Sequence, residues 1–198
     1  MKGAGLFSFF LFALPLYLLL RTGSLSEVGL FLLAALIHEA GHLFAAIALG
    51  YRPKGFLLTP AGASLRLDLS LAPYRKEVLI HSAGPVANGT AMLVTFLFLR
   101  FHFSFLLLYF FFCNGLFLFF NLMPVKGLDG YQALHAALSL RRDEETAERF
   151  LLPLHRLFFV FIALLGIWAL IRFHNASLLV FSFLEILEGQ TKKATRIS

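Results

Sequence analysis

Two histidines and a glutamate stand in a His-Glu-x-x-His arrangement inside an apolar stretch, as His38, Glu39 and His42. On an α-helix, residues four positions apart share a face, so both imidazoles would point into one space. That spacing can hold a zinc ion, and the Glu39 side chain can reach a water molecule beside it. An ionisable side chain at membrane depth costs about 2.5–3.5 kcal/mol, so three of them within residues 28–49 require a compensating partner. A divalent cation is the simplest such partner.

A third protein ligand is expected from a later segment, Asn-Leu-Met-Pro-Val-Lys-Gly-Leu-Asp-Gly at residues 121–130. Its proline and glycines predict irregular backbone, which can carry an acidic side chain towards a metal from a second direction. Catalytic zinc commonly has three protein ligands, and two histidines with one carboxylate is a known set. Asp129 is therefore the predicted third ligand, with an Asp-Gly turn that caps the next helix as the alternative. Asp68 and Glu77 are weaker candidates.

The remaining histidines that we considered lie outside any recognisable metal-ligand spacing. For these residues ordinary polar contacts are expected: His81, His135 and His155.

The composition is that of an integral membrane protein. Of the 198 residues, 59% are hydrophobic and 14% are charged, against about 45–50% and about 25% in soluble domains. The single cysteine, Cys113, excludes an internal disulfide and is expected to be a small apolar side chain. The net charge of +6 could indicate a nucleic-acid partner, but the basic residues gather in loops on one side of the predicted membrane. The protein is therefore expected to lie in the lipid bilayer and to bind no nucleic acid.

Apolar runs predict about six transmembrane helices in one domain, residues 1–198. They lie at residues 6–20, 28–49, 77–99, 103–122, 151–171 and 176–187. The first run resembles the apolar region of a signal peptide but is predicted to be a helix within residues 1–22. Ser24 and Glu27 form a capping box that begins the second helix. The last run has only 12 residues, too short to cross about 30 Å as a helix.

The other segments complete this organisation. Residues 24–135 form the predicted catalytic core, and residues 150–188 form C-terminal helices. Residues 130–140 are expected to be a short helix, residues 141–149 a charged solvent loop, and residues 189–198 a polar tail.

A change of periodicity after the second helix predicts a β-hairpin. Leucines alternate with polar residues over residues 64–71, which is the period of a half-buried strand, and residues 56–58 precede it with Thr-Pro-Ala-Gly as turn chemistry. An open strand edge cannot face lipid, so the hairpin should be re-entrant within a protein-lined cavity or lie at the membrane interface. A plain surface loop is the alternative. The predicted fold is thus an all-α membrane protein with this one β element.

Charge asymmetry predicts the orientation. With six crossings and both termini inside, the inner side holds all but three of the 17 lysines and arginines, the exceptions being Arg21, Arg100 and Arg172. The positive-inside rule then places the metal site in the cytoplasmic half of the membrane.

The third span contains Ala-Gly-Pro-Val-Ala-Asn at residues 83–88. Small residues of this kind allow helices to approach closely. Asn88 could donate a hydrogen bond to a substrate carbonyl, or it could bond to a neighbouring helix.

Three motifs together resemble the site-2 proteases, which are intramembrane zinc metalloproteases. They are His-Glu-Ala-Gly-His at 38–42, Gly-Pro-Val-Ala-Asn at 84–88, and Asn-x-x-Pro followed, after four intervening residues, by Asp-Gly at 121–130. Their order and spacing are most similar to bacterial sporulation members of the family, which process a sigma-factor precursor. The resemblance covers about residues 25–135.

The resemblance implies one Zn²⁺ per chain, held by His38, His42 and Asp129, with Glu39 as the catalytic base. It also implies that the hairpin pairs with an unwound substrate strand. The residues expected to bind substrate are Asn88, Asn121, Pro124 and, in the hairpin, Ser64, Leu65, Arg66 and Leu67.

The predicted function is therefore hydrolysis of a peptide bond in or near a membrane-associated segment of a protein, as in regulated intramembrane proteolysis. The expected partners are that substrate, with a sporulation sigma-factor precursor as the specific candidate, and a regulatory membrane protein. The expected location is the bacterial cytoplasmic membrane, in sporulation that of the forespore, with the active site towards the cytoplasm. The alternatives are a divalent-cation transporter and a catalytically inactive scaffold. Only Glu39 and Asp129 are acidic within the apolar region, which is few for a transport path.

Overall fold

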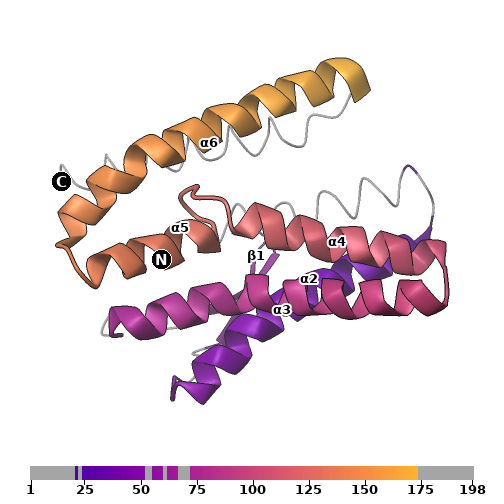
Figure 1. The fold of residues 1–198 in the computed structure, drawn as a ribbon, viewed down its shortest axis with the longest axis horizontal. Helices are drawn as coiled ribbons and strands as arrows, with labels where there is room; N and C mark the ends of the chain where they lie inside the picture. The colour runs from indigo at the N-terminus through magenta and orange to yellow at the C-terminus, as the bar shows by residue number, and fades with distance from the viewer. Residues whose placement is uncertain (1–20, 22–23, 52–54, 60–61, 67–71, 174–198) are drawn as a thin grey trace.

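The computed structural model describes residues 21, 24–51, 55–59, 62–66 and 72–173, and Figure 1 shows their arrangement. These residues form five helices and one hairpin. The elements are α2 (Leu25–Ala48), β1 (Gly55–Thr59), β2 (Gly62–Arg66), α3 (Tyr74–Phe101), α4 (Phe105–Asn121), α5 (Asp129–Ser139) and α6 (Glu144–Phe173). The predicted first helix, the last apolar run, the polar tail, Leu67 and Asp68 lie outside the described residues.

The architecture is predominantly helical, as predicted, but the described residues do not support the count of six spans. Three of their helices are long and apolar enough to cross a membrane, namely α2, α3 and the 144–168 part of α6. Helix α4 is apolar but has only 17 residues, and α5 has 11. At a rise of about 1.5 Å per residue, α5 is far shorter than a bilayer.

The two strands pair antiparallel, with Phe56 opposite Leu65 and Thr59 opposite Gly62. Strand β2 also lies against α2, the helix that carries the His-Glu-x-x-His sequence. A re-entrant position of this hairpin in the bilayer stays a prediction.

Helix α2 begins and ends where the sequence indicates. The Ser24 side chain accepts a hydrogen bond from the Glu27 amide at 3.4 Å, which satisfies one of the free donors of the first turn. At the other end Gly50 has a φ of +86°, in the left-handed region that glycine adopts without strain.

Helix α3 is the centre of the assembly, since it contacts α2, α4 and α5 (Figure 1). Its crossing with α2 is close because small residues meet there. A Cβ atom added to Gly41 would lie 2.5 Å from the Ala83 carbonyl oxygen and 2.8 Å from the Ala87 Cβ. Only glycine fits at that point, which confirms the close approach expected from the small-residue cluster.

The apolar core beneath α2 joins it to α4. Phe31, Ala34 and Ala35 pack against Cys113 and Phe117, with the Phe31 and Phe117 rings 5.2 Å apart. Cys113 is buried there, in the expected role of a small apolar side chain. Outside this core, large apolar side chains cover the helices, Phe44 and Phe101 being 75% and 90% exposed. Such a surface suits lipid and would aggregate in water.

Residues 144–149 belong to α6, so the predicted solvent loop at 141–149 is wrong over most of its length. Polar side chains explain the extra turns. Asp143 accepts a hydrogen bond from the Thr146 amide at 2.9 Å, and Arg149 pairs with Glu145 four residues earlier at 2.6 Å. Charged residues here extend a helix end into water.

We predict that Gly41→Ala lowers stability, because its methyl group collides with the α3 backbone. Overpacking of this kind typically costs about 1–3 kcal/mol. Gly89→Ala is the matched control on α3, since the nearest atom to its added Cβ is 3.7 Å away. Thermal unfolding in detergent should show a lower midpoint for Gly41→Ala alone. Equal midpoints for the two variants would contradict the close crossing.

Candidate metal centre

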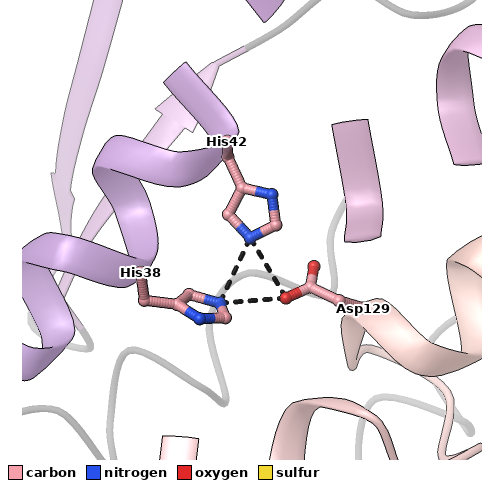
Figure 2. A group of neighbouring side chains, drawn as sticks. All are labelled: His38, His42 and Asp129. Carbon is pink, nitrogen blue, oxygen red and sulfur yellow. Dashed lines mark hydrogen bonds and ion pairs between the residues drawn. The ribbon is translucent and has the colours of Figure 1, made fainter. Parts of the chain in front are cut away.

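Three side chains from two helices converge on one point, as Figure 2 shows. The Asp129 Oδ2 atom lies 2.9 Å from the His38 Nε2 atom and 3.1 Å from the His42 Nε2 atom, and the two Nε2 atoms are 3.1 Å apart. Among the described residues these three form the one His/Cys/Asp/Glu group that could hold a metal ion. Glu77 is not in it.

The opposite side of each imidazole ring decides where its proton lies. The His42 Nδ1 atom is 2.7 Å from the Ile80 carbonyl oxygen, which can only accept, so this nitrogen carries hydrogen and donates. The His38 Nδ1 atom is 2.7 Å from the Asn88 Oδ1 atom and donates to it in the same way. With hydrogen on both Nδ1 atoms, neutral imidazoles present two Nε2 lone pairs to the centre.

This donor set fits a divalent metal ion. Two lone pairs and a carboxylate oxygen in mutual contact repel one another unless a metal ion, or a proton on one of the Nε2 atoms, lies among them. With bonds of about 2.0–2.2 Å, ligand atoms of a tetrahedral zinc site lie about 3.3 Å apart, close to the separations here. The chemistry and the spacing therefore both suit zinc.

Helix α3 leaves room for the centre at Gly84. A Cβ atom there would collide with the His42 ring and lie 2.8 Å from the His38 Cε1 atom. The site is open on the side of Asp129, whose side chain is 19% exposed, and closed around His38, at 1%. Of these two side chains, that of Asp129 is thus the more accessible.

Glu39 is next to His38 on α2 and is partly buried. Its carboxylate interacts electrostatically with both imidazoles and with Asp129. The role of Glu39 as a catalytic base stays a prediction.

Asn88 makes different contacts from the expected substrate contact. It is 0% exposed, and its Nδ2 group donates to the Ala34 carbonyl and to the Asn114 Oδ1 atom, each at 2.9 Å. Its Oδ1 atom accepts from His38. The alternative left open by the sequence, a bond to a neighbouring helix, is what the structure shows.

The other residues expected to bind substrate are placed as follows. Asn121 is 2% exposed and donates to the Phe117 carbonyl one turn earlier, and Pro124 is buried beside it in the irregular segment. Ser64, Leu65 and Arg66 lie in β2. Substrate binding by these residues stays a prediction.

Two polar residues at the site were missed. The His81 Nδ1 atom lies 3.7 Å from the Asp129 Oδ1 atom, on the open side, and Asn114 bonds to Asn88 from α4. A sequence signal existed for His81, which precedes Gly84 by three residues and Asn88 by seven and so shares their helix face. No such signal points to Asn114. The contacts of His135 and His155, with the Tyr131 ring and the Lys126 amide, are ordinary.

No protein-family model matches this sequence. The chain is 31% identical over 157 residues to stage IV sporulation protein FB of Bacillus subtilis, an alignment that covers 76% of this chain and 52% of that protein. It thus spans about half the length of this curated relative.

Among solved structures, the fold is similar to that of a site-2 protease from Methanocaldococcus jannaschii. The TM-score is 0.64 at 20% identity, and the match covers 91% of this chain and 87% of that one. The apolar helices and these relatives together indicate a membrane protein. The sequence relative and the solved structure together support the assignment of this chain to the site-2 protease family.

Proposed function

We propose that this chain is a zinc-dependent intramembrane endopeptidase that binds one Zn²⁺ through His38, His42 and Asp129. The observation that carries the proposal is the contact among two Nε2 lone pairs and a carboxylate oxygen, 2.9–3.1 Å apart. Asp129 is 87 and 91 residues from the two histidines in the sequence. Without a cation this contact is repulsive. Family membership supports a protease over other zinc-binding functions.

Glu39 is the proposed proton carrier. Zinc bound by two imidazoles and a carboxylate supplies a Lewis acid that polarises a peptide carbonyl and makes water more acidic. The Glu39 carboxylate accepts the proton of the attacking water and later gives it to the leaving amine nitrogen. His38 and His42 keep their Nδ1 protons throughout, because their partners on that side are acceptors.

The proposed substrate is a membrane-associated protein with a locally unwound segment, because helical carbonyls are already hydrogen-bonded and crowded. The free edge of the hairpin could hold such a segment by strand pairing. Strand β2 supports this role through its position against α2. The sporulation sigma-factor precursor and a regulatory membrane partner are candidates that follow from the resemblance to sporulation members. The charge asymmetry supports a cytoplasmic orientation in a bacterial membrane.

Glu39→Gln should abolish most activity and retain the metal, because glutamine keeps the size of the side chain but cannot take a proton. General acid–base groups typically contribute about 10²–10⁴-fold to rate. Wild type and variant are co-expressed with membrane-tethered candidate precursors, cleavage is scored by gel, and zinc is measured on the purified proteins. Cleavage at the wild-type rate would refute the role of Glu39.

Asp129→Ala should lose zinc, because two imidazoles alone are an incomplete ligand set. Asp143→Ala is a matched control, since Asp143 also lies at a helix start but contacts only its own helix. Metal analysis after dialysis should find about one zinc per chain in the control and far less in Asp129→Ala. A full equivalent in Asp129→Ala would exclude it as a ligand.

The same preparations separate the two alternatives. A transporter would move zinc into proteoliposomes and would cleave nothing, whereas an inactive scaffold would bind partners without flux or cleavage. Glu39-dependent cleavage without flux supports the peptidase.

A further inference from the structure

Two buried asparagines, Asn88 on α3 and Asn114 on α4, form a chain of hydrogen bonds that ends at His38. Both side chains are 0% exposed. The chain runs from the Phe110 carbonyl through Asn114 and Asn88 to the His38 Nδ1 atom, with separations of 2.9, 2.9 and 2.7 Å. It therefore links α4, through α3, to α2 at a predicted metal ligand.

Each amide in this chain can adopt one orientation only. The Asn114 Nδ2 group donates to the Phe110 carbonyl, which leaves its Oδ1 atom to face Asn88. The Asn88 Nδ2 group donates to that oxygen and to the Ala34 carbonyl. Flipping either amide would bring oxygen against oxygen at about 2.9 Å, the length of a normal hydrogen bond. Two backbone carbonyls, which cannot become donors, thus fix both side chains.

The fixed amide of Asn88 in turn selects one form of His38. Because Asn88 presents its Oδ1 atom, the His38 Nδ1 atom must carry hydrogen. The neutral ring then has its lone pair on Nε2, which faces Asp129 and His42. Outer hydrogen bonds to metal-binding histidines set ring form and orientation in this way.

We infer that Asn88 and Asn114 are positioning residues that keep the proton of His38 on Nδ1 and direct its Nε2 lone pair to the metal. The inference rests on the proposed function in that His38 binds a metal ion. It replaces the expected hydrogen bond from Asn88 to a substrate carbonyl, because both N–H donors of the Asn88 amide are bonded to protein.

Another buried polar side chain of α3 bonds within its own helix instead. Thr95, also on α3 and 4% exposed, bonds to the Ala91 carbonyl of its own helix. Asn88 instead bonds to two groups of α2 and one of α4. Its bonds therefore set the position of another helix's side chain.

The test measures zinc affinity, by chelator competition, and thermal stability of the metal-free protein for four variants of the full chain. Asn88→Ala should bind zinc about 10–100-fold more weakly, the usual effect of losing such a partner. Asn88→Asp should stay near wild type in affinity, because a carboxyl oxygen still accepts from His38. Both variants should lose stability, because both lose the Nδ2 group that donates to the Ala34 carbonyl and to the Asn114 Oδ1 atom. Thr95→Ala, the control, should leave affinity unchanged.

Asn114→Ala should weaken zinc binding less than Asn88→Ala does. The double variant should bind zinc as weakly as Asn88→Ala alone, because Asn114 acts through Asn88. It also serves as the test if Asn88→Ala does not fold. The absorption of bound Co²⁺ should shift in Asn88→Ala and not in Asn88→Asp.

Two results would overturn the inference. The first is equal loss of affinity in Asn88→Ala and Asn88→Asp, which would make the role purely structural. The second is wild-type affinity in Asn88→Ala or, if that variant does not fold, in Asn114→Ala. The proposed function would fail in different experiments. If the wild-type protein binds no zinc, the proposed metal site is wrong. If zinc-loaded protein cleaves nothing, the proposed peptidase activity is wrong, but the affinity measurements still test the role of Asn88 and Asn114.

Discussion

The structure depends on one electrostatic constraint, the contact among three electron-pair donors at the junction of α2 and α5. In a low-dielectric interior such a contact is strongly unfavourable until a cation compensates it. The features around it make sense on that basis. The N–H group of each imidazole points away from the centre to an acceptor, and Gly84 removes the Cβ that would fill it. The surrounding residues thus orient the Nε2 lone pairs of both histidines towards one point.

Helix α3 provides most of this arrangement although it contributes no predicted ligand. One face of it supplies the Ile80 carbonyl, His81, Gly84 and Asn88, all directed at α2 or Asp129. Its close crossing with α2 at Gly41 brings these groups within hydrogen-bonding distance. Placing the site on packed helices gives a precision that a loop could not.

Unlike the two histidines, which lie within α2, Asp129 is the first residue of α5 and follows an irregular segment. Gly127 has a φ of +93°, and a Cβ atom on Gly130 would collide with the Leu122 backbone, so two glycines allow the tight return of the chain. The position at a helix start also favours a carboxylate, because the free amides of the first turn carry partial positive charge. The partly exposed sides of Asp129 and His81 leave this part of the site open.

The sequence by itself was enough to predict the three side chains that meet at the candidate metal centre and the apolar helices. Those signals are local, because four-residue spacing puts His38 and His42 on one face, and a capping box marks where α2 begins. The Asp129 prediction depended on ligand chemistry and on the resemblance to a family. The length of α6 was underestimated, because charged residues looked like a loop although a cap and an ion pair made them helical.

Only the tertiary structure decided what Asn88, Asn114 and His81 do. The role of a hydrogen-bonding side chain depends on its partner, and the partners on other helices lie 26 to 54 residues away in the sequence. Helix packing brings these groups together, and the spacing of residues along the sequence does not reveal contacts between different helices.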